Sequence, residues 1–255
     1  MYQLIGMKTS FVYLSPNTHR LSEHGKEYTD AYIFVKQLSC GLTHPILLNF
    51  RANKDAHRLK LRMGVLRFNR LLKAAISHRL AQYQGDNITL ISHQQERKLF
   101  KVKSTRNYEA ILPEHIRQYI QIATLKHNVK QQRGQYHANQ KSTAAKGSGN
   151  VTGLNEVPTL SSRNAAKLLN LNSYTYAATL LTKLKPFGLT LTQNRVQIPP
   201  QQYVQHKGKH YARYDKTDGK YYFIGANIPH FSSFYSKPLT KPVKSTFADR
   251  MLEVA

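Results

Sequence analysis

Two stretches of this chain carry polar, cationic and small side chains in patterns that suit contacts with nucleic acid. The first set lies on the polar face of residues 66–80 and consists of Arg67, Asn69, Arg70 and Lys73. The second set consists of Asn172, Ser173, Tyr174, Thr175, Ala178, Lys183 and Arg195. In the major groove of DNA, Arg pairs with guanine, Asn pairs with adenine, and a small side chain contacts the thymine methyl group. We expect the first set and the first five residues of the second set to contact bases, while Lys183 and Arg195 contact phosphates.

The net charge of the chain favours a polyanionic partner. The sequence has 38 Lys and Arg against 13 Asp and Glu, which gives a formal net charge of +25 with neutral histidines. Contacts between such a surface and phosphates release condensed counterions. The predicted partner is double-stranded DNA, and other replication or transcription proteins are further candidates. The sequence predicts no particular oligomeric state.

Two other partners fit the same charge. A structural or packaging protein, such as a virion component, would coat nucleic acid without sequence preference. A protein that binds RNA or the ribosome would have a similar composition. Equal affinities for specific and scrambled DNA would identify the coating protein.

The sequence predicts no membrane partner. No apolar run approaches the roughly 20 residues needed to span a bilayer, and residues 1–10 lack the basic start and apolar core of a secretory signal. The single cysteine, Cys40, excludes an internal disulfide and suits a reducing compartment. We therefore expect a cytoplasmic location, in a bacterial host cell or its nucleoid.

Catalytic and metal-binding patterns are missing from the sequence. It has no Gly-x-x-x-x-Gly-Lys-Ser/Thr phosphate loop, no His-x-His pair and no His-Glu-x-x-His helix. Asp86, Asp215 and Asp218 fall in predicted turns and form no evident pair for two metal ions. Residues 210–213, His-Tyr-Ala-Arg, resemble the His-x-x-Arg element of tyrosine recombinases, but that family carries it on helices and this stretch predicts a hairpin. We predict no enzymatic activity, no metal and no cofactor.

Two short helices at a sharp turn should position the second set. The sequence predicts a helix over residues 161–169, a turn at Asn170, which tolerates the left-handed conformation, and a second helix capped by Ser173. The residues expected to pack inward are Leu171, Tyr176 and Leu180. The residues expected to stay exposed at the start of the helix are Tyr174 and Thr175.

Two hairpins are predicted after these helices. In the first, residues 189–191 and 196–198 are β-prone, and the polar residues 193–195 form the turn. In the second, residues 209–214 and 220–225 flank a loop that contains glycine.

The first third of the chain predicts a similar order of elements. A helix over residues 28–40 precedes a short strand at 45–50. Helices over residues 54–63 and 66–80 flank Gly64. A hairpin follows, with strands at 81–84 and 88–91. The order is therefore helix, strand, helix, turn, helix, hairpin.

Both segments resemble winged helix-turn-helix proteins. Residues 166–176 resemble the helix-turn-helix signature, in which a small residue opens the motif, a glycine holds the turn and polar residues begin the recognition helix; Asn170 stands in place of the glycine. The resemblance implies an α+β, mostly helical fold with two winged helix-turn-helix units and a C-terminal β-hairpin. Tandem winged helices resemble transcriptional regulators and replication initiators of phages, plasmids and other mobile elements, so we expect a DNA-binding protein of that kind.

Shifts in composition predict the domain boundaries. Residues 1–97 form the N-terminal winged-helix-like domain, and residues 98–133 a connector and long helix. Residues 134–156 are rich in Gln, Asn, Ser, Gly and Lys and predict a flexible linker or insertion. Residues 157–200 form the second winged helix-turn-helix, and residues 201–255 the β-hairpin and an extended C-terminal tail.

Overall fold

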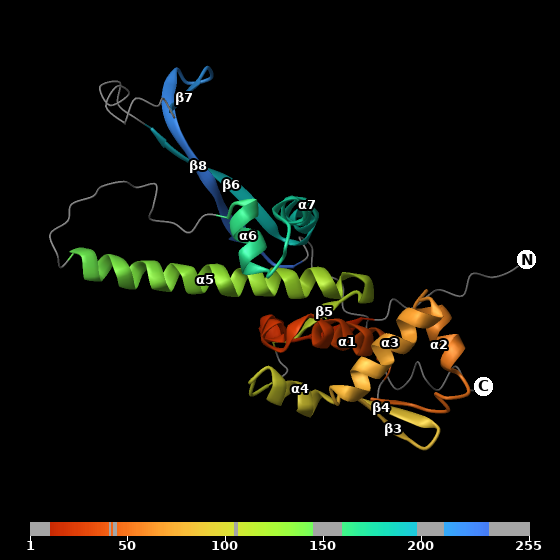
Figure 1. Cartoon of the computed structure of the whole chain (residues 1–255). Helices are drawn as coiled ribbons and strands as arrows, with labels where there is room; N and C mark the ends of the chain where they lie inside the picture. The colour runs from red at the N-terminus through yellow and green to blue at the C-terminus, as the bar shows by residue number, and fades with distance from the viewer. Residues whose placement is uncertain are drawn as a thin grey trace, which may run out of the picture. The chain divides into compact units, whose positions relative to one another are not determined.

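The computed structural model describes residues 11–40, 42, 45–104, 107–144, 160–197 and 212–234 (Figure 1). The chain divides between Arg117 and Gln118 into two compact units, called unit 1 and unit 2 below. Helices predominate in the described residues, and the strands form small antiparallel sheets. The fold is therefore α+β and mostly helical, as predicted.

Unit 1 contains the predicted helices, short strand and hairpin of the first third of the chain. Its helices are η1 (Pro16–His24), α1 (Gly25–Leu38), α2 (Lys54–Lys60), α3 (Val65–Ser77), α4 (His93–Leu99) and η2 (Pro113–His115). Its strands are β1 (Val12–Leu14), β2 (Ile46–Leu47), β3 (Ala81–Gln84), β4 (Asn87–Leu90) and β5 (Glu109–Ile111). Strand β1 pairs with β5, and β2, β4 and β3 form a three-stranded antiparallel sheet in that order.

Helices α1 and α3 form much of the core of unit 1. Phe34 of α1 and Phe68 of α3 are fully buried, and their rings meet edge to face with centroids 5.2 Å apart. Leu71, Leu72 and Ala75 continue the buried face of α3. This spacing of apolar residues leaves the polar side chains of α3 at the surface.

Unit 2 consists of helices followed by a three-stranded antiparallel sheet. Its elements are α5 (Ile116–Ala144), which begins at the end of unit 1, α6 (Ser162–Leu168), α7 (Tyr174–Leu184), η3 (Lys185–Phe187), β6 (Leu189–Gln197), β7 (Ala212–Asp215) and β8 (Lys220–Phe231). Strand β8 is central, with β6 on one side and β7 on the other. Gly188 lies between η3 and β6 at φ 95°, where a Cβ atom would lie 2.5 Å from the Ser233 carbonyl oxygen, so only glycine fits there.

The predicted hairpin over residues 189–198 is wrong, whereas the C-terminal hairpin is present as β7 and β8. Residues 189–197 form the single strand β6, which pairs with β8. The polar residues that were expected to turn lie at an irregularity, where the register shifts between Gln193 and Arg195. A β-bulge and a turn both accommodate extra polar residues, so the local pattern did not distinguish them.

Helix α5 extends further than predicted. It continues to Ala144, so the predicted linker at residues 134–156 begins inside a helix. This part of the chain includes Gln, Ala and Lys, which favour helix even without an apolar face. The rest of that linker, residues 145–156, lies outside the described residues, as do His210, Tyr211 and the predicted tail.

Helix α4 was not predicted; a connector was expected from residue 98. Ser92 Oγ accepts a hydrogen bond from the Gln95 backbone N–H at 3.3 Å, and Gln95 Oε1 accepts one from the Ser92 N–H at 2.8 Å. This reciprocal capping box is visible in the sequence as Ser-x-x-Gln and was the available signal for the helix.

Candidate nucleic-acid interface

Serine and asparagine side chains set the turn between α6 and α7. Ser161 Oγ accepts a hydrogen bond from the Asn164 N–H at 3.1 Å at the start of α6. Ser173 Oγ accepts one from the Tyr176 N–H at 3.2 Å at the start of α7. Asn170 adopts the predicted left-handed conformation, with φ 51°. Because Ser173 Oγ caps the helix, this predicted base-contacting residue has a structural role as well.

Helix α7 buries one face, which differs from the predicted one at Tyr176. Its buried residues are Ala177, Leu180, Leu181 and Leu184. The inward prediction for Tyr176 is wrong, because its side chain is 52% exposed. Ala177 takes the inward position next to it, and α6 buries the equally small Ala165 and Ala166. The buried face of α7 therefore centres on Ala177, Leu180, Leu181 and Leu184, and Tyr176 lies at its edge.

The predicted base-contacting residues of unit 2 lie at the surface. Asn172, Ser173, Thr175, Ala178 and Lys183 are exposed. Tyr174 is 59% exposed, and the Arg163 guanidinium of α6 lies 5.8 Å from the centre of its ring. The side chain of Arg195 lies outside the described residues; its backbone pairs with Ile224 in the sheet.

Two threonines that the sequence did not single out, Thr179 and Thr182, extend the exposed face of α7. Thr179 Oγ1 donates to the Thr175 carbonyl oxygen at 3.2 Å, and Thr182 Oγ1 donates to the Ala178 carbonyl oxygen at 3.2 Å. Both hydroxyl groups are therefore satisfied by their own helix. Lys183 is the only charged residue of α7.

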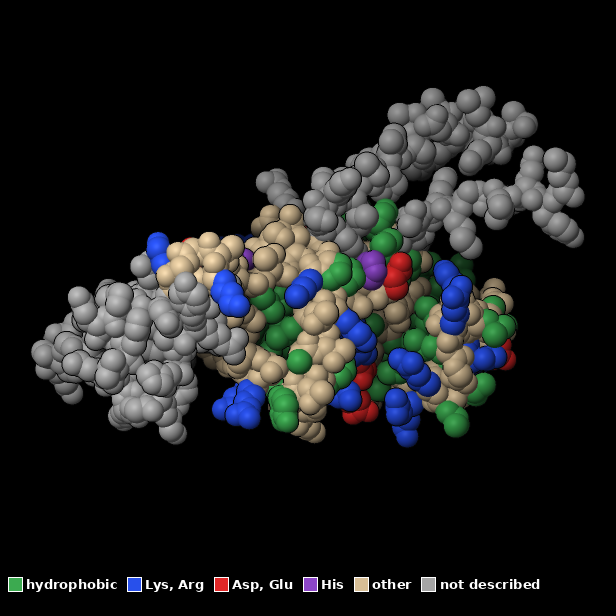
Figure 2. All heavy atoms as spheres, turned by 90° about the horizontal axis from the view of Figure 1, so that it is seen from above, with side chains coloured by type: hydrophobic (Ala, Val, Ile, Leu, Met, Phe, Trp, Pro, Cys, Tyr) green, Lys and Arg blue, Asp and Glu red, His purple; other side chains and the backbone are tan. Residues whose placement is uncertain are grey.

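The sequence around this helix is almost free of acidic residues. Between His115 and Tyr214 the only Asp or Glu is Glu156. Exposed cations flank the turn and the end of α7: Arg163, Lys167, Lys183 and Lys185. On the face drawn in Figure 2, Lys and Arg side chains also outnumber Asp and Glu. Unneutralised charge of one sign favours association with a polyanion.

In unit 1, Arg67 and Arg70 of α3 line a small polar recess beside α1. The recess has a volume of about 50 Å³, and Asp30, Gln37 and Arg117 also line it. Asp30 Oδ1 lies 2.6 Å from Arg117 Nη2, so the one carboxylate in this lining is already paired. The positive charges of Arg67 and Arg70 are therefore available to an external anion such as a phosphate.

Asn69 and Lys73 lie on the opposite flank of α3. Together with Lys54 of α2 they line an open recess of about 360 Å³. Leu66, which the sequence did not single out, lies between the two pairs on the helix surface and is 88% exposed. All four predicted residues are exposed, but the structure places them in two pairs rather than in one cluster.

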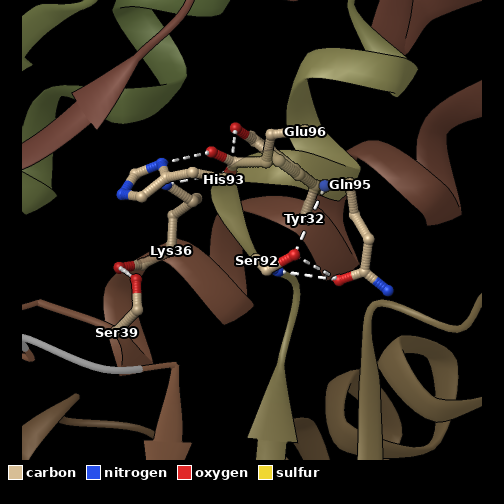
Figure 3. A network of polar contacts seen from close by, with 7 residues as sticks. All are labelled: Tyr32, Lys36, Ser39, Ser92, His93, Gln95 and Glu96. Atoms are coloured by element: carbon tan, nitrogen blue, oxygen red, sulfur yellow. Dashed lines mark hydrogen bonds and ion pairs between the residues drawn. The ribbon is translucent and has the colours of Figure 1, made fainter. Parts of the chain in front are cut away.

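A buried ionic network in unit 1 connects α4 to α1 (Figure 3). Lys36 Nζ lies 2.9 Å from Glu96 Oε1, and the Tyr32 hydroxyl donates to the same oxygen at 3.0 Å. His93 Nδ1 lies 3.3 Å from Glu96 Oε2. The sequence did not indicate this network, because Tyr32 and Glu96 are 64 residues apart.

The pKa shifts in this network favour a permanent ion pair. Burial raises the pKa of Tyr32 well above its usual value, and the charge of Glu96 raises it further. Burial would also raise the pKa of Glu96, but the hydrogen bond from His93 and the charge of Lys36 outweigh it, so that pKa is lowered. Burial and the charge of Glu96 raise the pKa of Tyr108 to about 12. Near neutral pH the carboxylate is thus ionised and both tyrosines are protonated, which suits an anchor for α4.

The part of the chain that the structure describes holds neither a metal-ligand cluster nor a membrane span. There, no group of three or more His, Cys, Asp and Glu residues could hold a metal ion. None of the helices described is both long enough and apolar enough to cross a bilayer.

Comparisons with protein-family models, with curated proteins and with solved structures find no match. Function is therefore inferred from the residues and geometry of the chain itself.

Proposed function

We propose that this protein binds double-stranded DNA through two winged helix-turn-helix units, as a transcriptional regulator or replication initiator of a phage, plasmid or other mobile element. One repeated arrangement carries the proposal. In each unit two short helices meet at a turn with a left-handed residue, Arg62 (φ 51°) before α3 and Asn170 (φ 51°) before α7. The second helix then exposes its polar or small residues, and antiparallel strands follow.

The strand pairing supports the same proposal. In unit 1, β2 precedes α2 and pairs with β4, the second strand of the hairpin. In unit 2, the Leu160 N–H precedes α6 and donates to the Asn227 carbonyl oxygen of β8 at 2.6 Å. Strand β8 is also the partner of β6, which follows α7. In both units, the segment before the first helix of the pair is thus hydrogen-bonded to a strand that follows the second helix.

The proposed roles follow the side-chain positions on α3 and α7 and, for Arg195, its charge and its place in β6. Helices α3 and α7 enter the major groove, where Asn69, Arg70 and Lys73 contact base edges. Arg67, in its recess with Arg117, binds a backbone phosphate, as do Lys183 and Arg195. The proposal includes no catalytic step, metal or cofactor.

Site selection from a random pool of double-stranded DNA, with the full chain, tests the proposal. The dissociation constants for the selected site and a scrambled site are then measured over a range of salt concentrations. A sequence-specific protein should bind the selected site about 10³- to 10⁷-fold more tightly. The slope of log affinity against log salt reports the number of phosphates contacted. Equal affinities at every salt concentration would overturn the proposal and favour a protein that coats nucleic acid.

A further inference from the structure

One stripe of the exposed surface of α7 consists of small side chains that carry methyl groups, and the exposed Tyr174 and Tyr176 lie outside it. Its members, called the methyl face below, are Thr175, Ala178, Thr179 and Thr182. The hydroxyl groups of Thr179 and Thr182 donate to carbonyl oxygens of their own helix. Of the residue types that form paired hydrogen bonds with guanine or adenine, α7 contains only Lys183, which lies in its last turn and outside the methyl face. The methyl face of this helix therefore offers mainly apolar contacts to a DNA groove.

We propose that the methyl face recognises the 5-methyl groups of thymine in the major groove. This inference rests on the proposed function and specifies which base the second unit selects. The thymine methyl is the apolar group among the base edges of the major groove, and Ala and Thr methyl groups are its usual contacts. Small side chains also let the helix backbone approach the bases closely.

The length of the methyl face fits a short run of bases. Thr175 and Thr182 lie two helical turns apart, which is about 10 Å along the axis at 1.5 Å per residue. Successive bases on one strand are about 3.4 Å apart, so the face spans about three base steps. Positions 175, 178, 179 and 182 follow the i, i+3, i+4, i+7 spacing of one continuous stripe.

The surrounding charge favours DNA over a second copy of the chain as the occupant of this face. Arg163 and Lys167 lie exposed on α6, and Lys183 and Lys185 lie exposed at the other end of α7. Acidic residues that would pair with them in a dimer are almost missing from this part of the sequence, where Glu156 is the only one between His115 and Tyr214. Two such surfaces would repel each other, whereas phosphates along the groove would be attracted to both ends of α7.

Replacing single thymines by deoxyuridine in the selected site tests the inference, because this change removes the methyl group alone. With the full chain, the dissociation constant at each contacted position should rise about fourfold, the factor that corresponds to burial of one methyl-sized group. The variants Thr179→Ser and Thr182→Ser keep the hydroxyl and lose the methyl. At the position facing the changed residue, each variant should bind thymine and uracil DNA equally.

Lys167→Gln is the matched control, because Lys167 is exposed on α6 and not in the methyl face. It should weaken binding to thymine and uracil DNA by the same factor. If the wild-type chain binds its site specifically but shows no preference for thymine, or if both serine variants keep the full preference, the inference is overturned and the proposed function stands. If no DNA sequence is preferred at all, both fall.

Discussion

Helices α3 and α7 follow similar turns but expose different chemistry. The surface of α3 carries Arg67, Asn69, Arg70 and Lys73 in two pairs beside recesses. The surface of α7 carries threonine, alanine and two tyrosines in its first turn, with one lysine in its last turn. Similar turns therefore precede both helices, while the residues on the outward face decide what each can bind.

The two units also differ in what holds them together. Unit 1 has a buried ion pair between Lys36 and Glu96 that connects α4 to α1. In unit 2, β6 and β8 pair over most of their length, and α7 buries Leu180, Leu181 and Leu184. Unit 1 should therefore respond to substitutions of charged core residues, and unit 2 to substitutions of apolar ones.

Loss of the buried lysine should have the largest effect on stability. Lys36→Met leaves Glu96 buried without its cationic partner, so we expect the free energy of unfolding of unit 1 to fall by about 3–5 kcal/mol. Urea denaturation of the full chain measures this change. Lys26→Met, at an exposed position of the same helix, is the control and should change stability by about 0.5 kcal/mol or less. If the two substitutions lowered the free energy of unfolding equally, the buried ion pair would not stabilise unit 1 as proposed.

Leu180→Ala should destabilise unit 2 by about 2–5 kcal/mol, because Leu180 is buried and the substitution leaves a cavity. Thermal and urea denaturation of the full chain would show the loss. Unit 1 should unfold at its original midpoint. A wild-type unfolding profile for this variant would show that α7 packs through another face.

Arginine substitutions on α3 should have an intermediate effect, seen in binding rather than in stability. Arg67→Ala and Arg70→Ala should each weaken binding by about 1–3 kcal/mol if the side chain contacts bases, with relaxed base preference. A variant that loses only a phosphate contact should instead weaken binding to all sequences and reduce the salt slope by about one. We expect the second behaviour for Arg67. Equilibrium binding to a panel of site variants distinguishes the two outcomes.

The stability of unit 1 should fall at acidic pH, and this effect should be smaller than those of the substitutions above. Because the pKa of Glu96 is lowered in the folded state, the carboxylate stabilises unit 1 fully above its unfolded pKa. That stability is lost as the pH falls from the unfolded value through the lower folded value. Melting temperatures of the wild type and of Glu96→Gln, recorded from neutral to acidic pH, measure the effect. A wild-type curve parallel to that of the variant would contradict it.

Thr175→Ala should have the smallest effect on stability. Thr175 is exposed at the start of α7, so the free energy of unfolding should change by no more than about 0.5 kcal/mol. DNA affinity should fall, because the side chain belongs to the methyl face. Thermal melts and binding isotherms on the same preparation test both statements. Unfolding of unit 2 by this change would mean that the proposed DNA-binding face is part of the core.

Local signals in the sequence determined most of the helices, but not α4 or the end of α5, and one of the two tight turns. Apolar spacing placed α1 and α3 within a few residues of their observed ends, and Ser173 and Asn170 marked the cap and the left-handed turn before α7. These features depend on neighbours within about four residues, because capping hydrogen bonds and helical faces are short-range. The exposed positions of the predicted residues on α3 follow from the same periodicity.

Only the tertiary structure decided the features that join distant segments. The partner of β6 is β8, which comes after residues 198–211, and the bulge near Gln193 looks like a turn when the strand is considered alone. Tyr176 is exposed, and the neighbouring Ala177 takes the buried position in its place. Lys36 and Glu96 meet only when α4 folds back on α1. Such contacts depend on which segments are brought together in space, and no local pattern of residues specifies that choice.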